Sequence, residues 1–202
     1  MDRPRLVVLV SGSGSNLQAI VDATTDGTLA ADIVAVVSNR TDAYGLERAR
    51  QAGIETCALP RSADEARADY DVRLAQVVAE YRPDWIVLAG WMRLLTMKFL
   101  GCFPNRVVNL HPALPGELAG THAIERAWEQ AVAGERDHSG VMVHLVPDEG
   151  VDDGPVLATS TVPIDTSGTL EAFEAAIHRA EHRLLVDTLV SLTSDHRPPE
   201  TT

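Results

Sequence analysis

The stretch Arg5–Asn16, with the sequence RLVVLVSGSGSN, joins an apolar run to a glycine loop. Its first six residues are β-prone and almost wholly apolar, as expected of a strand that is buried on both faces of a sheet. The loop Ser11–Asn16 follows this strand directly, and a helix is predicted over Asn16–Thr25. A buried strand, a glycine turn and a helix in this order indicate the first unit of a parallel α/β sheet.

The same alternation continues along the chain. Further strands are predicted at Ile33–Ser38, Glu55–Leu59, Trp85–Ala89 and Val107–Leu110, and helices at Tyr44–Ala52 and Ala63–Tyr81. The second half predicts a helix over Thr121–Ala133, two antiparallel sheet extensions at Val141–Val146 and Pro155–Val162, and an amphipathic helix over Thr169–Leu192. We therefore expect an α/β fold: a single-domain, doubly wound, mostly parallel sheet with helices on both faces and a Rossmann-type amino-terminal half. Residues 1–193 would form this domain, and residues 194–202 a flexible tail.

Composition narrows the class of protein. The 202 residues carry a formal net charge of −12, which argues against broad contact with nucleic acid but not against binding one small phosphate. The two cysteines, Cys57 and Cys102, form no C-x-x-C pair and indicate neither a disulfide framework nor a zinc site. No apolar run approaches the roughly 20 residues of a membrane span, and no signal peptide follows Met1. We expect a cytoplasmic protein that binds neither nucleic acid nor membranes.

The glycine loop is the first candidate binding site. Its glycines allow close approach of a ligand to the backbone, and the free N–H groups of a helix N-terminus favour an anion. No Lys follows the loop, and Leu17 replaces the third glycine of a dinucleotide fingerprint. The second strand ends in Asn39 and Arg40 rather than in an acidic residue. A phosphate monoester therefore fits better than NAD, with a simple helix-capping turn as the alternative.

The segment Val107–Pro112, VVNLHP, carries the second candidate site. Residues two apart point to the same face of a strand, so Asn109 and His111 are expected to project together. Pro112 stops the strand, which leaves both side chains at its carboxyl end, where open α/β sheets bind ligands. An amide donor beside an imidazole suits acyl transfer through an oxyanion. The alternative is structural: Asn109 would cap a turn, and His111 would be a core residue whose hydrogen bonds are met within the protein.

The loop Pro147–Pro155 is acidic and lies between the last two predicted strands. A carboxylate near His111 would favour the imidazolium and raise the pKa of that residue. A solvated acidic loop is the plain alternative, and a calcium site is weaker because the spacing does not match an EF-hand.

Five ordered motifs together resemble the phosphoribosylglycinamide formyltransferase family, the folate-dependent glycinamide ribonucleotide transformylases of purine biosynthesis. The resemblance extends from Leu6 to Leu189. The motifs are Ser11–Ile20, Gly45–Ala49, Leu88–Arg93, Asn109–Pro112 and Val151–Pro155, and the segment Gly116–Ala127 resembles one branch of the family.

The resemblance implies a function and a set of site residues. It implies transfer of a formyl group from 10-formyltetrahydrofolate, as co-substrate, to the amine of 5-phosphoribosylglycinamide, without a metal. The acidic composition is compatible with a monomer or homodimer. The matching positions are Asn109, His111 and Asp152 for catalysis; Gly14, Ser15, Asn16 and His178 for the phosphate and Glu181 for the ribose; and Arg67, Met92, Arg93, Leu94 and Leu95 for the folate, with Val146 and Asp148 in a loop over the pterin.

Three departures from the family pattern bear on these positions. Asp153 stands where a glycine is common, so two adjacent carboxylates compete for the catalytic role, and the Asp-x-Gly-Pro frame favours Asp152. Gly150 resembles an insertion, which affects the pterin contacts. His178 replaces a longer polar side chain at the phosphate.

Four other functions remain open from the sequence. A formyltetrahydrofolate hydrolase would have little use for a phosphate loop, and hydrolases of this kind carry an extra amino-terminal domain that we do not expect here. A methionyl-tRNA formyltransferase would need a basic tRNA-contacting region and an added carboxy-terminal domain. A non-catalytic phosphosugar-binding module would use the glycine loop alone. A Rossmann oxidoreductase is disfavoured by Leu17 and by the missing acidic residue.

Overall fold

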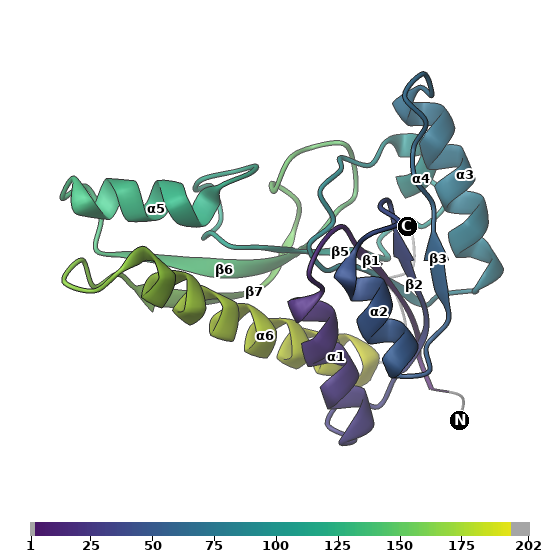
Figure 1. Cartoon of the computed structure of the whole chain (residues 1–202), viewed down its shortest axis with the longest axis horizontal. Coiled ribbons are helices and arrows are strands. Elements are labelled where there is room, and N and C mark those ends of the chain that lie inside the picture. The colour runs from purple at the N-terminus through teal and green to yellow at the C-terminus, as the bar shows by residue number, and fades with distance from the viewer. Residues whose placement is uncertain (1–2, 195–202) are drawn as a thin grey trace.

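The structure is a computed structural model that describes residues 3–194 (Figure 1). Its elements follow one another as β1 Arg5–Val10, α1 Ser15–Thr25, β2 Asp32–Ser38, α2 Tyr44–Gln51, β3 Thr56–Ala58, α3 Arg67–Glu80, β4 Trp85–Leu88, α4 Met97–Leu100, β5 Val107–His111, α5 Ala123–Val132, β6 His138–Leu145, β7 Val156–Pro163 and α6 Leu170–Ser194. Ser194, which was predicted to begin the tail, is the last residue of α6, and the rest of that predicted tail lies outside the described residues.

The strands of the described chain form one seven-stranded sheet in the order β3-β2-β1-β4-β5-β6-β7. Strands β1 to β5 pair in parallel, whereas β6 and β7 add to the edge in antiparallel orientation. The predicted α/β class and the antiparallel extension are both confirmed. The chain leaves β1 toward β2 on one side and returns to β4 on the other, so the strand order reverses between β1 and β4.

The sheet is covered on both faces, and the alternation of β1 shows how. Leu6, Val8 and Val10 pack into a core with α1, α2, α5 and α6. Val7 and Leu9, which point the other way, pack into a second core with α3 and α4. All of β1 after Arg5 is buried, as predicted for a strand between two helix layers.

Several element ends differ from the prediction by one to four residues, and two helices differ for identifiable local reasons. Helix α3 begins at Arg67 rather than at Ala63, because Glu65 lies in a loop where its carboxylate accepts from Ser62 N and from Arg73. Helix α4 was not predicted, since four residues are too few for a periodic pattern. Asp71 anchors the start of this helix by accepting from Thr96 N at 2.6 Å.

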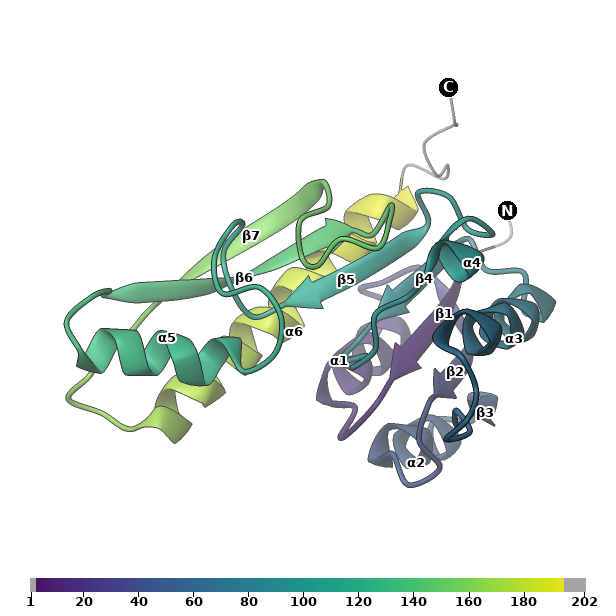
Figure 2. The ribbon, with the colours of Figure 1, turned by 90° about the horizontal axis from the view of Figure 1, so that it is seen from above.

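The sheet positions a site where its strand order reverses. The loops after β1 and β4 meet there, and Ser11 N donates to Gly90 O at 3.1 Å. Beyond β5, the pair β6–β7 extends away from the parallel strands, and α5 and the first half of α6 accompany it (Figure 2). No helix within residues 3–194 is long and apolar enough to cross a membrane.

Candidate active site

A cavity of about 700 Å³ opens at the carboxyl ends of β4 and β5. Loops after β4, before α5 and after β6 form its walls, and Asn109, His111, His144 and Asp152 contribute polar groups. A concave, largely apolar space with a few convergent polar groups is typical of a small-molecule site.

Strand β5 presents the first two of these groups as predicted. Asn109 and His111 lie two residues apart at its carboxyl end and both line the cavity. His111 is buried, with 4% of its surface exposed, and Asn109 is half-buried. The strand continues through His111 because the following Pro112 favours extended geometry at the residue before it.

The loop between β6 and β7 supplies Asp152, whose backbone adopts φ of 55°. This left-handed conformation directs the carboxylate toward β5: Oδ2 lies 3.3 Å from His111 Nδ1, and Oδ1 accepts from Asn109 Nδ2 at 3.1 Å. Gly120 N also donates to Oδ2, at 2.9 Å. Asp153 is exposed, and its carboxylate lies against Gly150 of its own loop. The structure therefore brings Asp152, rather than Asp153, to His111.

Both ring nitrogens of His111 face oxygen acceptors. Nδ1 faces Asp152, and Nε2 lies 3.2 Å from the carbonyl oxygen of Leu118. Burial lowers the pKa of His111 below its ordinary value, and the opposing contributions of Asp152 and the Leu118 carbonyl do not outweigh it. A raised pKa was predicted, and the net direction is wrong, because that expectation counted the carboxylate and omitted the desolvation of a buried ring.

Asp152 is ionised more readily than an ordinary Asp. Burial raises the pKa of its carboxyl, but the approach of His144, the Gly120 N–H and His111 together lower it below the usual value. A half-buried carboxylate in contact with an imidazole and an amide can accept or pass on a proton.

Sequence reasoning missed His144, which lies on β6 opposite Asn109. Its Nε2 is 3.1 Å from Asn109 Nδ2 and 3.6 Å from Asp152 Oδ1. A polar residue within the apolar run Val141–Val146 was the only available signal, and its partner depends on the register between two strands.

The predicted folate residues divide into those that line the cavity and one that does not. Met92 and Leu94 are apolar side chains with 71% and 47% exposure, so they offer accessible apolar surface. Arg67 lies outside the lining, and its guanidinium pairs at 2.6 Å with Glu149, which does line the cavity. The predicted residues in the lining are Met92, Arg93, Leu94, Leu95, Val146 and Asp148.

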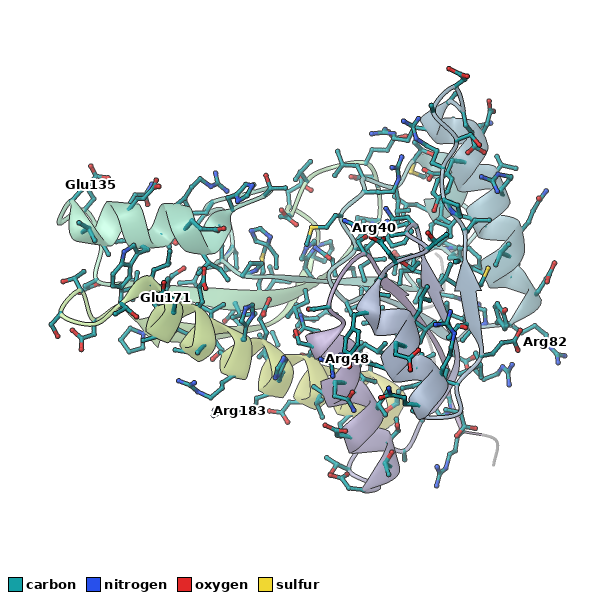
Figure 3. The ribbon with its side chains drawn as sticks, viewed as in Figure 1. Arg40, Arg48, Arg82, Glu135, Glu171 and Arg183 are labelled. Carbon is teal, nitrogen blue, oxygen red and sulfur yellow. The ribbon has the colours of Figure 1, made fainter. Side chains whose placement is uncertain are left out.

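The glycine loop lies outside this cavity lining, at the start of α1. Gly14 has φ of 71°, and a Cβ there would lie 2.6 Å from Gly45 Cα, so glycine is required both by conformation and by the close approach of α2. Arg48 of α2 donates to Ser13 O at 2.8 Å and lies where α1 and α2 meet (Figure 3). Among the described residues, the buried Asn16 Oδ1 has no hydrogen-bond partner, and no side chain caps the start of α1.

The two predicted substrate residues of α6 contact each other. His178 Nδ1 lies 2.6 Å from Oε2 of the buried Glu181, and this hydrogen bond raises the pKa of His178 despite partial burial. Neither residue lines the cavity, but α6 packs beside α1, which carries the glycine loop (Figure 1).

Comparisons by sequence and by structure find similar proteins of one family. Residues 4–189 match the family model described as Formyl transferase. The chain is 44% identical to phosphoribosylglycinamide formyltransferase of Schizosaccharomyces pombe, over 95% of this chain and 98% of that relative, and 42% identical to the Escherichia coli protein of the same name, over 89% and 82%. The crystal structure of phosphoribosylglycinamide formyltransferase from Bacillus halodurans matches with a TM-score of 0.88 at 34% identity, covering 98% of this chain and all of that one.

Proposed function

The chain belongs to the formyl transferase family, and on that premise we propose that Asn109, His111 and Asp152 carry out its reaction. The enzyme is a phosphoribosylglycinamide formyltransferase, which places a formyl group on the amine of 5-phosphoribosylglycinamide in purine biosynthesis. The observation that carries the residue assignment is the convergence of these three side chains in one cavity, with Asp152 in contact with both others. We further propose that residues 1–193 act as one domain in the cytoplasm, as a monomer or homodimer.

The family implies a folate-derived formyl donor, and we propose 10-formyltetrahydrofolate bound in the 700 Å³ cavity. The exposed apolar side chains of Met92 and Leu94 would contact its aromatic rings, together with Arg93 and Leu95. Val146 and Asp148, from the loop after β6, would cover the pterin. Arg67 would act through the same loop, since it holds Glu149.

For the phosphorylated substrate we propose the start of α1. Gly14, Ser15 and Asn16 would hold the phosphate with backbone N–H groups and the amide of Asn16. On α6, Glu181 would contact the ribose hydroxyls and His178 the phosphate side. The raised pKa of His178 supports a positive charge there.

In the reaction, the substrate amine attacks the formyl carbon and forms a tetrahedral oxyanion. Collapse breaks the bond between that carbon and the folate nitrogen, so one proton must leave the amine and one must reach the folate nitrogen. Asn109 and the His111 imidazolium would stabilise the oxyanion, and Asp152 would move the proton, directly or through water.

The contacts that Asn109 and His111 now make indicate which partners an oxyanion would replace. Both N–H groups of the Asn109 amide have protein acceptors, so an oxyanion at Asn109 would replace Asp152 Oδ1. That carboxylate oxygen would then be available to the amine proton. At His111, an oxyanion would replace the Leu118 carbonyl at Nε2. Burial disfavours the His111 imidazolium in the resting site. The negative charge that develops on the oxyanion would stabilise this imidazolium, and it would do so most in the transition state.

A formyl-transfer assay with His111→Ala tests the proposal. Loss of an oxyanion donor typically lowers kcat by about 10²–10³, and we expect that loss with little change in the Kd of 5-phosphoribosylglycinamide. Wild-type kcat in a folded His111→Ala enzyme would contradict the assignment. The wild-type enzyme should also release no formyl group when the amine is omitted, whereas a hydrolase would release it.

A further inference from the structure

His144 is a buried imidazole to which the proposed reaction assigns no role. It lies on β6 directly opposite Asn109 in the antiparallel pairing with β5, and 2% of its surface is exposed. The same side chain lines the cavity beside Asn109 and Asp152.

The surroundings of His144 determine which ring nitrogen carries the hydrogen. Nδ1 lies 2.9 Å from the carbonyl oxygen of Leu145, which can only accept, so Nδ1 is the protonated nitrogen. In a neutral ring Nε2 is then an acceptor. Its lone pair then faces Asn109 Nδ2 at 3.1 Å, whereas Asp152 Oδ1 lies farther from Nε2, at 3.6 Å.

The Asn109 amide is oriented by the same reasoning. Its Nδ2 lies 3.1 Å from His144 Nε2 and 3.1 Å from Asp152 Oδ1. If the amide were turned over, its oxygen would face the carboxylate of Asp152 and the lone pair of His144 Nε2, which are both acceptors. One N–H therefore points to His144, and the other points to Asp152.

We propose that His144 is a positioning residue for formyl transfer: it holds one N–H of Asn109 so that the other points to the reacting centre. This inference rests on the proposed function, in which Asn109 donates to the oxyanion. When the oxyanion replaces Asp152 at the second N–H, the bond to His144 prevents the amide from rotating and presenting its oxygen instead. The Leu145 carbonyl thus orients the His144 ring, and the ring orients the Asn109 amide. The oxyanion donor is therefore fixed before substrate binds.

Two substitutions of His144 separate this role from packing. In Gln, the side-chain oxygen lies as many bonds from Cβ as Nε2 does, so His144→Gln can still accept from Asn109. In Asn, the polar atoms correspond to Nδ1 only, so His144→Asn can still bond to the Leu145 carbonyl but cannot reach Asn109. Both variants lose the ring and remain polar.

The test measures kcat and KM for both variants in the full-length chain, with folding checked by circular dichroism. Small displacements of a catalytic group can cost about 100-fold, so we expect His144→Asn to lower kcat by roughly 10- to 100-fold with KM unchanged. His144→Gln should retain most of kcat. Equal losses in the two variants, or a loss confined to KM, would overturn the proposal.

A double-mutant cycle with Asn109→Ala tests whether His144 acts through Asn109. Once the amide is removed, His144→Asn should lower kcat no further, whereas an independent packing effect would multiply with the first loss. The cycle also separates the two proposals. If Asn109→Ala alone has wild-type kcat, the assignment of Asn109 fails. If that variant is impaired but His144→Asn is not, only the role of His144 fails.

Discussion

At the end of β5 the side chains of Asn109 and His111 have protein partners, whereas at the start of α1 the amide oxygen of Asn16 has none among the described residues. Asn109 and His111 each contact two acceptors from neighbouring segments. Asn16, also buried, has an amide oxygen without a partner among the described residues, and no side chain caps the helix that follows Gly14. The two regions would therefore bind a ligand in different ways. At β5 a reacting group must displace existing contacts. At α1 a phosphate would accept from helix N–H groups that no side chain caps, and the amide oxygen of Asn16 would accept only from a hydroxyl or amine of the ligand.

The largest expected effect separates the two adjacent carboxylates of the β5 region. Asp152→Asn should lower kcat by about 100-fold or more, because it removes the proton acceptor that contacts both His111 and Asn109. Asp153→Asn is the matched control: its carboxylate is exposed, and kcat should stay near the wild-type value. Steady-state formyl transfer measures both. Similar losses in the two variants would remove the basis for choosing Asp152.

A second pair of substitutions tests the rigid backbone of the α1 region. Gly14→Ala should lower the free energy of unfolding by about 2–4 kcal/mol, because it forces a left-handed residue with a Cβ against Gly45. Gly12→Ala meets no atom within 4 Å and should stay within about 0.5 kcal/mol of wild type. Urea denaturation compares them, and equal stability of the two variants would show that the close approach of α1 to α2 is relaxed in solution.

A smaller effect concerns the pKa of His111. NMR titration of the ring should give a pKa below the ordinary 6.5 in the wild-type enzyme, because burial lowers it. Asp152 raises the pKa of His111, so Asp152→Asn should lower it further, while Asp153→Asn should leave it unchanged. A wild-type pKa above 6.5 would mean that the carboxylate, and not burial, dominates.

The smallest expected effect is that of metal removal. No group of three or more His, Cys, Asp or Glu suited to a metal ion occurs within residues 3–194, and both proposed regions use amide, imidazole and backbone N–H groups as donors. Dialysis against a chelator should therefore leave kcat unchanged. A loss that added metal restores would require a different account of the oxyanion.

Much of the fold could be predicted because it follows from local patterns. The apolar run of β1 and the glycine turn after it indicated a buried parallel strand, and Pro112 indicated where β5 ends. The short helix α4 could not be predicted in this way, since it begins just after Thr96, whose backbone N–H donates to Asp71 of α3.

The site could be predicted only in part, because only some of its contacts follow from local sequence patterns. Spacing along one strand was enough to pair Asn109 with His111. The position of Asp152 depends on a left-handed loop residue, and that of His144 on strand register, and neither is visible in local sequence. The pKa of His111 was mispredicted because burial is a property of the packed structure.

One pair of matched substitutions tests most directly whether catalysis and phosphate binding are divided between the two regions. Asn109→Ala and Asn16→Ala each remove one amide, at β5 and at α1. We predict that Asn109→Ala lowers kcat by about 10²–10³ and changes the Kd of 5-phosphoribosylglycinamide by no more than about twofold. Asn16→Ala should raise that Kd by roughly 10-fold or more and leave kcat at saturation within about twofold. Equal losses of kcat and affinity in both folded variants would contradict the division.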